Sequence, residues 1–240
     1  MAAEQFRLRL RLRQLSHFHT SGPGRTLPLV DRTVMVDARG LPYIPASSVR
    51  GRVRAHLERL LHGLGEPVCT PPQSELTCPH HEGVGRALEE RGASEPFCPA
   101  CRLFGSSWRL SPIAFNDFRL ESQERGEIGL DQRTGVSINR YLGSAEEGRL
   151  YILETVPYQR GKGSAFTGSI EGFLSRRDVG WLLAALRTLT HLGGGKSRGL
   201  GRVELDSESI QLEFWNGEGQ EWLEEDWRPL LQGVLEDGTN

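Results

Sequence analysis

The chain has 240 residues, 29 basic and 31 acidic side chains, and a formal net charge of −2. No stretch approaches the roughly 20 consecutive apolar residues of a membrane span, and the N-terminal segment "MAAEQFRLRLRLRQLS" lacks the apolar core of a signal peptide. We therefore expect a cytoplasmic protein with no membrane contact, in which four cysteines are more typical of metal ligands or free thiols than of disulfides.

The charge is distributed unevenly along the chain. Residues 1–60 hold eleven arginines against four acids, whereas residues 204–240 hold eleven acids against one arginine. Only Lys162 and Lys196 are lysines. Arginine binds phosphate well because its planar group makes bidentate contacts, but genomic base composition explains the bulk count equally well. The number of arginines therefore does not distinguish phosphate binding from genomic composition, and only their positions can.

The first predicted element is a strand over residues 5–16. Its apolar residues alternate with arginines at positions 7, 9, 11 and 13, and a period of two indicates a half-buried strand. For the arginine row we favour a solvated sheet face over a binding surface.

A short strand over 34–36 and a helix come next. Ser47 or Ser48 can cap this helix, which is expected to run to about Leu61 and to be closed by Gly63. Several arginines lie near its start, where cations oppose the helix macrodipole. We therefore expect an anionic group to compensate them.

Residues 64–101 form a segment rich in Pro, Cys, His and Glu without clear periodicity, which indicates an insertion held by something other than a core. Zinc prefers four nitrogen or sulfur ligands in a tetrahedron. The preferred structural Zn²⁺ ligands are Cys69, Cys78, Cys98 and Cys101, with His80 and His81 as alternates. A set of buried or free thiols is the competing interpretation.

The remaining elements complete an α+β pattern. Residues 113–160 contain strand-like pieces, residues 175–193 a helix capped by Ser175, and "GLGRVELDS" and "IQLEFW" two late strands. This order predicts an antiparallel sheet of ferredoxin-like (RRM-like) type. The acidic C-terminal segment, 207–240, is either a packing segment or a surface that docks on a basic neighbour.

The stretch "HLGGGKSRGLGRVEL", residues 191–205, contains Gly195-Lys196-Ser197, as in a nucleotide-binding loop. A Walker A loop needs another glycine at position 190, where Thr190 stands, and it follows a strand and precedes a helix. Here a helix precedes and a strand follows, so the motif fails. A glycine-rich loop with Lys196 and Arg198 instead suits a nucleic-acid backbone.

Four segments in order resemble the RAMP superfamily, the RNA-binding subunits of CRISPR effector complexes. They are "GLPYIPASSVRGRVRAHLERLL", "CPACRLFGSS", "RTGVSINRYLGSAEEGRLYILETVPYQRGKGSAFTGSIEG" and "GGGKSRGLGRVEL". Together the similar parts span roughly residues 5–206. The third segment is similar to the family's protruding β-hairpin, or thumb.

The closest resemblance is to the repeated backbone subunit of type III effectors, which binds guide RNA and cuts complementary target RNA. It implies a catalytic role for Asp31, a need for Mg²⁺ or Mn²⁺, and partners that include other effector subunits and copies of itself. Asp37 is the weaker candidate. The implied RNA-binding residues are His19, Ser47, Ser48, Arg50, Arg52, Arg133, Thr134, Asn139, Arg140, Lys196, Ser197 and Arg198. His17 competes with His19, and Ala46 stands where the family usually has glycine.

The resemblance also implies how the chain is divided. We expect a palm-like core over 1–63, 102–120 and 150–210, the insertion over 64–101, and a thumb over 121–150. Val136, Ile138 and Tyr141 could form the thumb's apolar wedge, although strand packing is an equal alternative. The rival functions are a non-cutting RNA-binding subunit and a metal-independent enzyme that cuts repeat RNA with His17 or His19 as the base.

Overall fold

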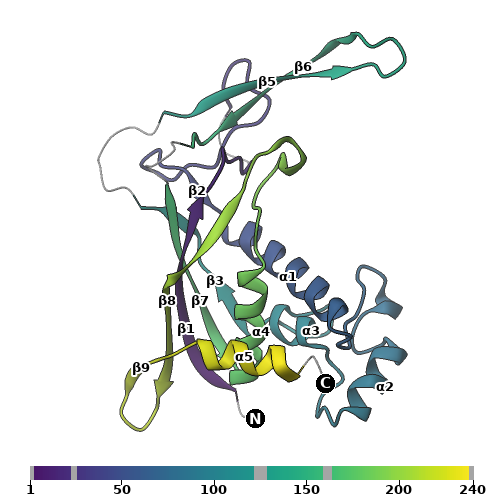
Figure 1. The fold of residues 1–240 in the computed structure, drawn as a ribbon, viewed down its shortest axis with the longest axis vertical. Coiled ribbons are helices and arrows are strands. Elements are labelled where there is room, and N and C mark those ends of the chain that lie inside the picture. The colour runs from purple at the N-terminus through teal and green to yellow at the C-terminus, as the bar shows by residue number, and fades with distance from the viewer. Residues whose placement is uncertain (1–2, 23–25, 122–128, 159–163, 238–240) are drawn as a thin grey trace.

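A computed structural model describes residues 3–22, 26–121, 129–158 and 164–237. It has mixed α+β structure around one mostly antiparallel sheet, as the sequence predicts (Figure 1). Its strands lie in the order β2-β4-β7-β1-β8-β9, and β3 also pairs with β7. Their bounds are β1 Glu4–Gln14, β2 Tyr43–Ile44, β3 Ile113–Phe115, β4 Phe118–Leu120, β7 Ala165–Leu174, β8 Val203–Asn216 and β9 Glu221–Glu225.

Strand β1 lies at the centre of the sheet, paired with β7 on one side and β8 on the other. Its leucines are fully buried toward the helices, while its arginines point to the open face. There the arginines meet acids from neighbouring segments, including Glu171, Glu204, Asp206 and Glu213. The basic N-terminal and acidic C-terminal parts of the sequence therefore neutralise one another across the sheet, as the solvated-face interpretation requires.

Helices α1 (Ala46–Gly63) and α4 (Arg176–Arg187) cover the other face of the sheet (Figure 1). Ser175 caps α4 as predicted, accepting a hydrogen bond from the Asp178 N–H. The predicted serine cap of α1 is wrong, because the helix begins at Ala46 and both Ser47 and Ser48 lie in its first turn. Instead, the Asp117 carboxylate accepts a 2.9 Å hydrogen bond from the Ala46 N–H. This acid supplies the negative charge expected at the helix start.

The insertion contains more regular structure than its sequence indicates. It holds the short helix η1 (Ser74–Leu76) and the helices α2 (Glu82–Glu90) and α3 (Pro99–Phe104). Helix α2 lies near one end of α1, whereas α3 contacts both α1 and α4 (Figure 1). Helix α2 is only nine residues long, which is too short for a clear amphipathic period.

A two-stranded hairpin of β5 (Asp131–Ile138) and β6 (Ala145–Thr155) projects from the main body (Figure 1). It occupies much of the predicted thumb, but β6 runs beyond residue 150 into the range assigned to the core. Residues 122–128 of that prediction lie outside the described residues.

The C-terminal part of the chain belongs to the body. Strand β8 is a single strand that continues past residue 210, not two separate strands, and a bulge opposite Arg9 and Arg11 accommodates the extra residues. Helix α5 (Arg228–Asp237) packs beside α4, with Trp227 and Val234 buried. These contacts favour the packing-segment interpretation. In the part of the chain that is described, no helix is long and apolar enough to cross a membrane.

Candidate functional site

The glycine-rich loop between α4 and β8 folds back onto residues 17–19. The Gly194 N–H donates to the His19 carbonyl at 2.9 Å, and the Gly201 N–H donates to the His17 carbonyl at 2.7 Å. Gly193 has φ +76, and a Cβ placed on it would lie 2.1 Å from the His19 oxygen. Glycine is therefore required at 193 both for its backbone conformation and for this close approach.

We expect Gly193→Ala to lower the free energy of unfolding by at least about 2 kcal/mol, because it combines left-handed backbone strain with a backbone clash. Gly194→Ala is the matched control, since its Cβ would meet only the His19 ring at 3.4 Å. Denaturant unfolding of both variants measures the difference. Equal stabilities would contradict the proposed fit of this loop.

An open cavity of about 430 Å³ lies between this loop and the first turns of α1. Its glycine lining comes from Gly51, Gly193 and Gly194. Its polar lining comes from Thr20, Ser21, Ser47, Ser48 and Arg52. The structure thus brings three of the predicted RNA-binding residues, Ser47, Ser48 and Arg52, to the cavity beside the glycine-rich loop. Thr20 and Ser21 were not predicted, and their signal is two short hydroxyl side chains directly after His19.

Arg50 lies elsewhere. Its guanidinium donates to the Phe104 carbonyl at 2.5 Å, and the neighbouring Arg54 donates to the Gly105 carbonyl at 3.0 Å. Both arginines therefore bind the carboxyl end of α3, away from the cavity that Arg52 lines. The periodicity of α1 separates them, because residues two positions apart point to different sides of a helix.

His19 is buried beside the cavity-lining glycines. Its Nδ1 lies 2.7 Å from the Glu154 carbonyl oxygen, which can only accept, so Nδ1 carries the proton. Burial lowers the pKa of His19, despite the opposing contact with Glu154. Its Nε2 then offers a lone pair that has no hydrogen-bond partner among the described residues. The competing His17 is more open, and its Nε2 lies 3.4 Å from the Asp131 carboxylate.

Lys196, Ser197 and Arg198 form the exposed short helix η2, which Gly195 and Gly199 flank in left-handed conformations. The Arg198 guanidinium lies over the Tyr151 ring on β6 and donates to its hydroxyl. Tyr151 in turn lies across Gly135 of β5, where any Cβ would meet its ring. The loop and the base of the hairpin are therefore in direct contact.

The outer part of the hairpin is exposed. Tyr141 and Leu142 at the turn are 96% and 70% exposed, and Ile138 is 55% exposed. Val136, the third residue of the predicted wedge, is 42% exposed, and Leu142 was not predicted. None of the three predicted residues is packed into the core, which argues against the strand-packing alternative. Arg133 and Thr134 are exposed on β5, Arg140 is exposed at the turn, and Asn139 holds the turn by accepting from the Tyr141 and Leu142 N–H groups.

Asp31 lies at the base of the hairpin, on the outer edge of β6. Its Oδ2 accepts from the Ile152 N–H at 2.7 Å, and its own N–H donates to the Ile152 carbonyl at 3.0 Å. These bonds fix an exposed carboxylate in place. Asp37 instead closes a turn: its Oδ1 accepts from the Arg39 and Leu41 N–H groups, which is the structural role expected of the weaker candidate.

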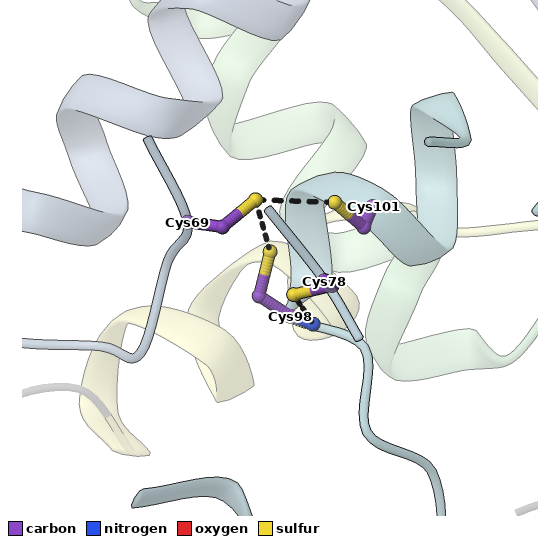
Figure 2. Close-up of side chains that lie close together, drawn as sticks. All are labelled: Cys69, Cys78, Cys98 and Cys101. Carbon is purple, nitrogen blue, oxygen red and sulfur yellow. Dashed lines mark hydrogen bonds between the residues drawn. The ribbon is translucent and has the colours of Figure 1, made fainter. Parts of the chain in front are cut away.

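The four cysteines converge in the insertion (Figure 2). All are buried, and their sulfurs lie within 4.8 Å of one another. The Cys69 Sγ lies 3.3 Å from that of Cys101 and 3.7 Å from that of Cys98. Sulfurs about 2.3 Å from a central zinc ion lie about 3.8 Å from one another. The donor set and its spacing therefore fit a tetrahedral metal such as zinc.

Contacts within the cluster favour a thiolate. Hydrogen bonds from Cys101 and then Cys69 lower the pKa of Cys98, whereas the contact with Cys69 raises the pKa of Cys101. The Cys98 N–H also donates to the Cys78 sulfur. The alternates have other contacts: His81 caps α2 through Nδ1, and His80 packs edge-on against Trp108. The cysteines thus form the ligand set that the geometry supports.

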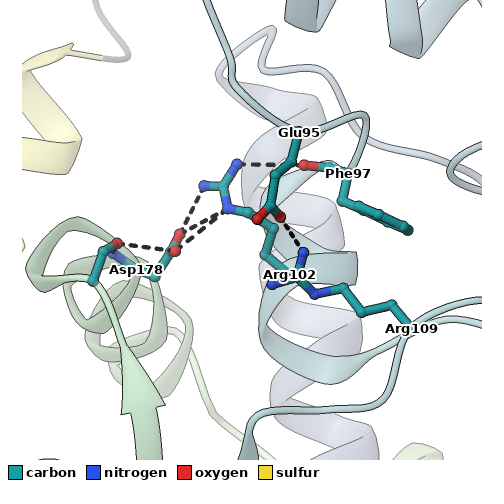
Figure 3. Close-up of polar contacts among 6 residues, drawn as sticks. Glu95, Phe97, Arg102, Arg109 and Asp178 are labelled. Atoms are coloured by element: carbon teal, nitrogen blue, oxygen red, sulfur yellow. Dashed lines mark hydrogen bonds and ion pairs between the residues drawn. The ribbon is translucent and has the colours of Figure 1, made fainter. Parts of the chain in front are cut away.

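Helix α3 joins this cluster to the body (Figure 3). Arg102, next to Cys101, pairs with Asp178 at the start of α4 at 2.7 Å. Arg109 pairs with Glu95 in the insertion. Because Arg50 on α1 also bonds the Phe104 carbonyl, α3 is in polar contact with both long helices.

Comparison with known families agrees with this arrangement. The family model described as the RAMP superfamily matches residues 12–204, well over half of the chain. No curated protein matches the chain. The matched region extends from β1 through the insertion, the hairpin and the glycine-rich loop to the start of β8.

Proposed function

Because the chain belongs to the RAMP superfamily, we propose that it is the repeated backbone subunit of a type III CRISPR effector complex. Membership itself indicates a CRISPR-associated RNA-binding subunit that works with RNA and other subunits. The further proposal is that guide RNA passes through the cavity, that complementary RNA is cut at regular intervals, and that neighbouring subunits include copies of this chain.

The main support for this RNA-binding position is the cavity lined by Ser47, Ser48, Arg52 and the glycine-rich loop. Hydroxyls, backbone N–H groups and cations can bind the sugar and phosphate groups of RNA. These groups are the same in every nucleotide, so such contacts do not depend on the base sequence. Base pairing with the guide supplies the sequence specificity. His19 is buried and its Nε2 is shielded from solvent, so we propose that it supports the glycine-rich loop beside the cavity and does not contact RNA directly.

We assign the core to the ferredoxin-like class. Along the chain, β1, α1, β4, β7, α4 and β8 follow the order β-α-β-β-α-β, and the four strands lie side by side as β4-β7-β1-β8. The hairpin is then an insertion between two core strands, which is where a thumb would project.

For cleavage, we assign the reacting carboxylate to Asp31. One of its oxygens holds the Ile152 N–H, and the other would accept the proton of a ribose 2′-hydroxyl. The 2′-oxygen then attacks the adjacent phosphorus, and the 5′-oxygen leaves and takes a proton from water. The products would be a 2′,3′-cyclic phosphate and a 5′-hydroxyl.

A divalent ion would have to share this site with RNA. Among the described residues, the only group of three or more metal-ligating side chains is the cysteine cluster, so Asp31 belongs to no such group. Mg²⁺ commonly binds through one or two carboxylates together with phosphate oxygens and water. Bound in that way, Mg²⁺ or Mn²⁺ would neutralise charge on the phosphate.

A cleavage assay tests the proposal. The complex is assembled with guide RNA, and end-labelled complementary RNA and Mg²⁺ are added. We expect a ladder of evenly spaced products. Tight target binding without a ladder would support the non-cutting alternative. Cleavage of repeat RNA by the isolated chain in EDTA would support the processing enzyme, for which the open His17 beside Asp131 fits better than the buried His19.

The exposed hairpin turn gives a separate prediction. An apolar wedge replaces base stacking when it opens a duplex. We therefore expect Tyr141→Ala with Leu142→Ala to weaken target binding about ten-fold and to leave guide binding unchanged. Leu29→Ala is the control, because Leu29 is also exposed but lies outside the hairpin. Gel-shift titrations with guide alone and with target measure both affinities.

A further inference from the structure

A group of basic side chains on α1 extends beyond the cavity. Arg52, His56 and Arg59 are spaced four and three residues apart, so they lie along one face of the helix. Arg52 lines the cavity, and the other two continue from it toward the carboxyl end of α1. From Arg52 to Arg59 this face covers about 10 Å, because a helix rises about 1.5 Å per residue.

The segment after α4 adds charge to the same face. The His56 Nδ1 lies 3.2 Å from the Thr188 hydroxyl, which places α1 against this segment. The side chains that influence His56 electrostatically are Arg59, Arg52, Lys196 and His191, in decreasing order, and each lowers its pKa. Burial and then these charges lower the pKa of His56 to about 4. Burial, followed by Arg52 and Arg59, likewise lowers the pKa of Lys196.

This cluster differs from the row of arginines on β1. On β1, every arginine of the exposed row has a carboxylate within 4.0 Å. Among the described residues, Arg52, Arg59 and Lys196 have no such carboxylate. Cations that repel one another without a counter-charge cost stability. In a chain of net charge −2, their convergence indicates an external anion.

We propose that this face of α1, with Lys196 and His191, is a second phosphate-binding subsite, which holds the RNA strand where it leaves the cavity. The inference rests on RNA occupying the cavity. It adds Arg59, His56 and His191 to the RNA-binding interface, and it implies that the RNA strand runs along α1 after it leaves the cavity. The alternative role of Arg59 is local, since its Nε donates to the Ala55 carbonyl within the helix.

Salt dependence of RNA binding separates these roles. The full chain is titrated with fluorescent oligo(U) and oligo(A) at several salt concentrations. We expect Arg59→Gln to weaken both about three- to ten-fold and to reduce the slope of log K against log salt by about 0.7, because one phosphate contact is lost. Arg86→Gln is the matched control: it removes the same charge from exposed α2, where Arg86 pairs with Glu82.

Arg52→Gln distinguishes failure of the subsite from failure of the cavity. If Arg52→Gln weakens binding and Arg59→Gln behaves like Arg86→Gln, the second subsite is wrong and the RNA-binding cavity stands. If neither variant weakens binding, both are wrong. Thermal melting of each variant confirms that it is folded.

His56 gives a second readout. Its pKa is lowered in the free chain, so between pH 6.5 and about 4 the unfolded state binds more protons and stability falls as the pH falls. A phosphate beside it favours the imidazolium. We therefore expect RNA affinity to rise between pH 7 and pH 5.5 by a larger factor in the wild type than in His56→Gln. Equal pH dependence in the two proteins would overturn the assignment of His56.

Discussion

Replacing Asp31 with alanine is expected to lower the rate of target RNA cleavage by about 10²- to 10⁴-fold, the usual contribution of a positioned acid or base. Guide and target binding should change little, because the cavity and the cationic face of α1 are unaffected. The measurement is the single-turnover cleavage rate of the assembled complex, with target binding measured on the same preparations.

Two control variants separate chemistry from positioning. Asp31→Ala also removes the acceptor for the Ile152 N–H, which costs about 1 kcal/mol locally. Asp31→Asn retains an acceptor oxygen but has no charge, so it should be as inactive as alanine if the carboxylate reacts. Asp37→Asn should retain cleavage. Recovery of cleavage in Asp31→Asn would show that Asp31 only anchors the loop to β6.

Removing the metal from the cysteine cluster is expected to have the largest effect on stability. A structural zinc contributes about 10–16 kcal/mol of apparent binding free energy in small domains, and the four cysteines tie three separate parts of the insertion together. We expect the purified chain to contain one zinc per molecule and Cys98→Ser to lose it. Elemental analysis measures the zinc, and limited proteolysis measures opening of residues 64–101.

The alternates provide the control for this experiment. His81→Ala removes the N-cap of α2, which costs about 1 kcal/mol, and it should retain the metal. Loss of zinc in His81→Ala together with its retention in Cys69→Ser would reverse the ligand assignment. Failure of Cys98→Ser to lose zinc would contradict the cluster itself.

The sequence predicts best the features that depend on local patterns. Strict alternation identifies β1, and the Ser175 cap identifies the start of α4, because each signal lies within a few adjacent residues. The α+β class and the choice of the four cysteines as preferred ligands also follow from the sequence. The sequence left His80 and His81 open as alternates, and only the geometry separates them from the cluster.

Features that depend on distant residues were not predictable in this way. The cap of α1 comes from Asp117, far along the chain, so local capping rules pointed to Ser47 and Ser48 instead. Arg50 and Arg52 appear equivalent in sequence, but only the packing of α3 against α1 separates their roles. The acidic C-terminal segment looks like an appendage until β8 pairs with β1.

The central position of β1 also has a consequence for synthesis of the protein. β1 is made first, but its two neighbours, β7 and β8, come from the second half of the chain. During translation, the arginines and leucines of β1 therefore have no paired strand beside them until β7 and β8 have been synthesised. Folding of this sheet can therefore be completed only after β8 has been synthesised, and such long-range pairing is slow and leaves apolar surface exposed in the meantime. A chain stopped before β8 lacks Glu204 and Glu213, so Arg9 and Arg13 lose their carboxylate partners while Arg7 and Arg11 keep theirs in Glu171 and Glu121.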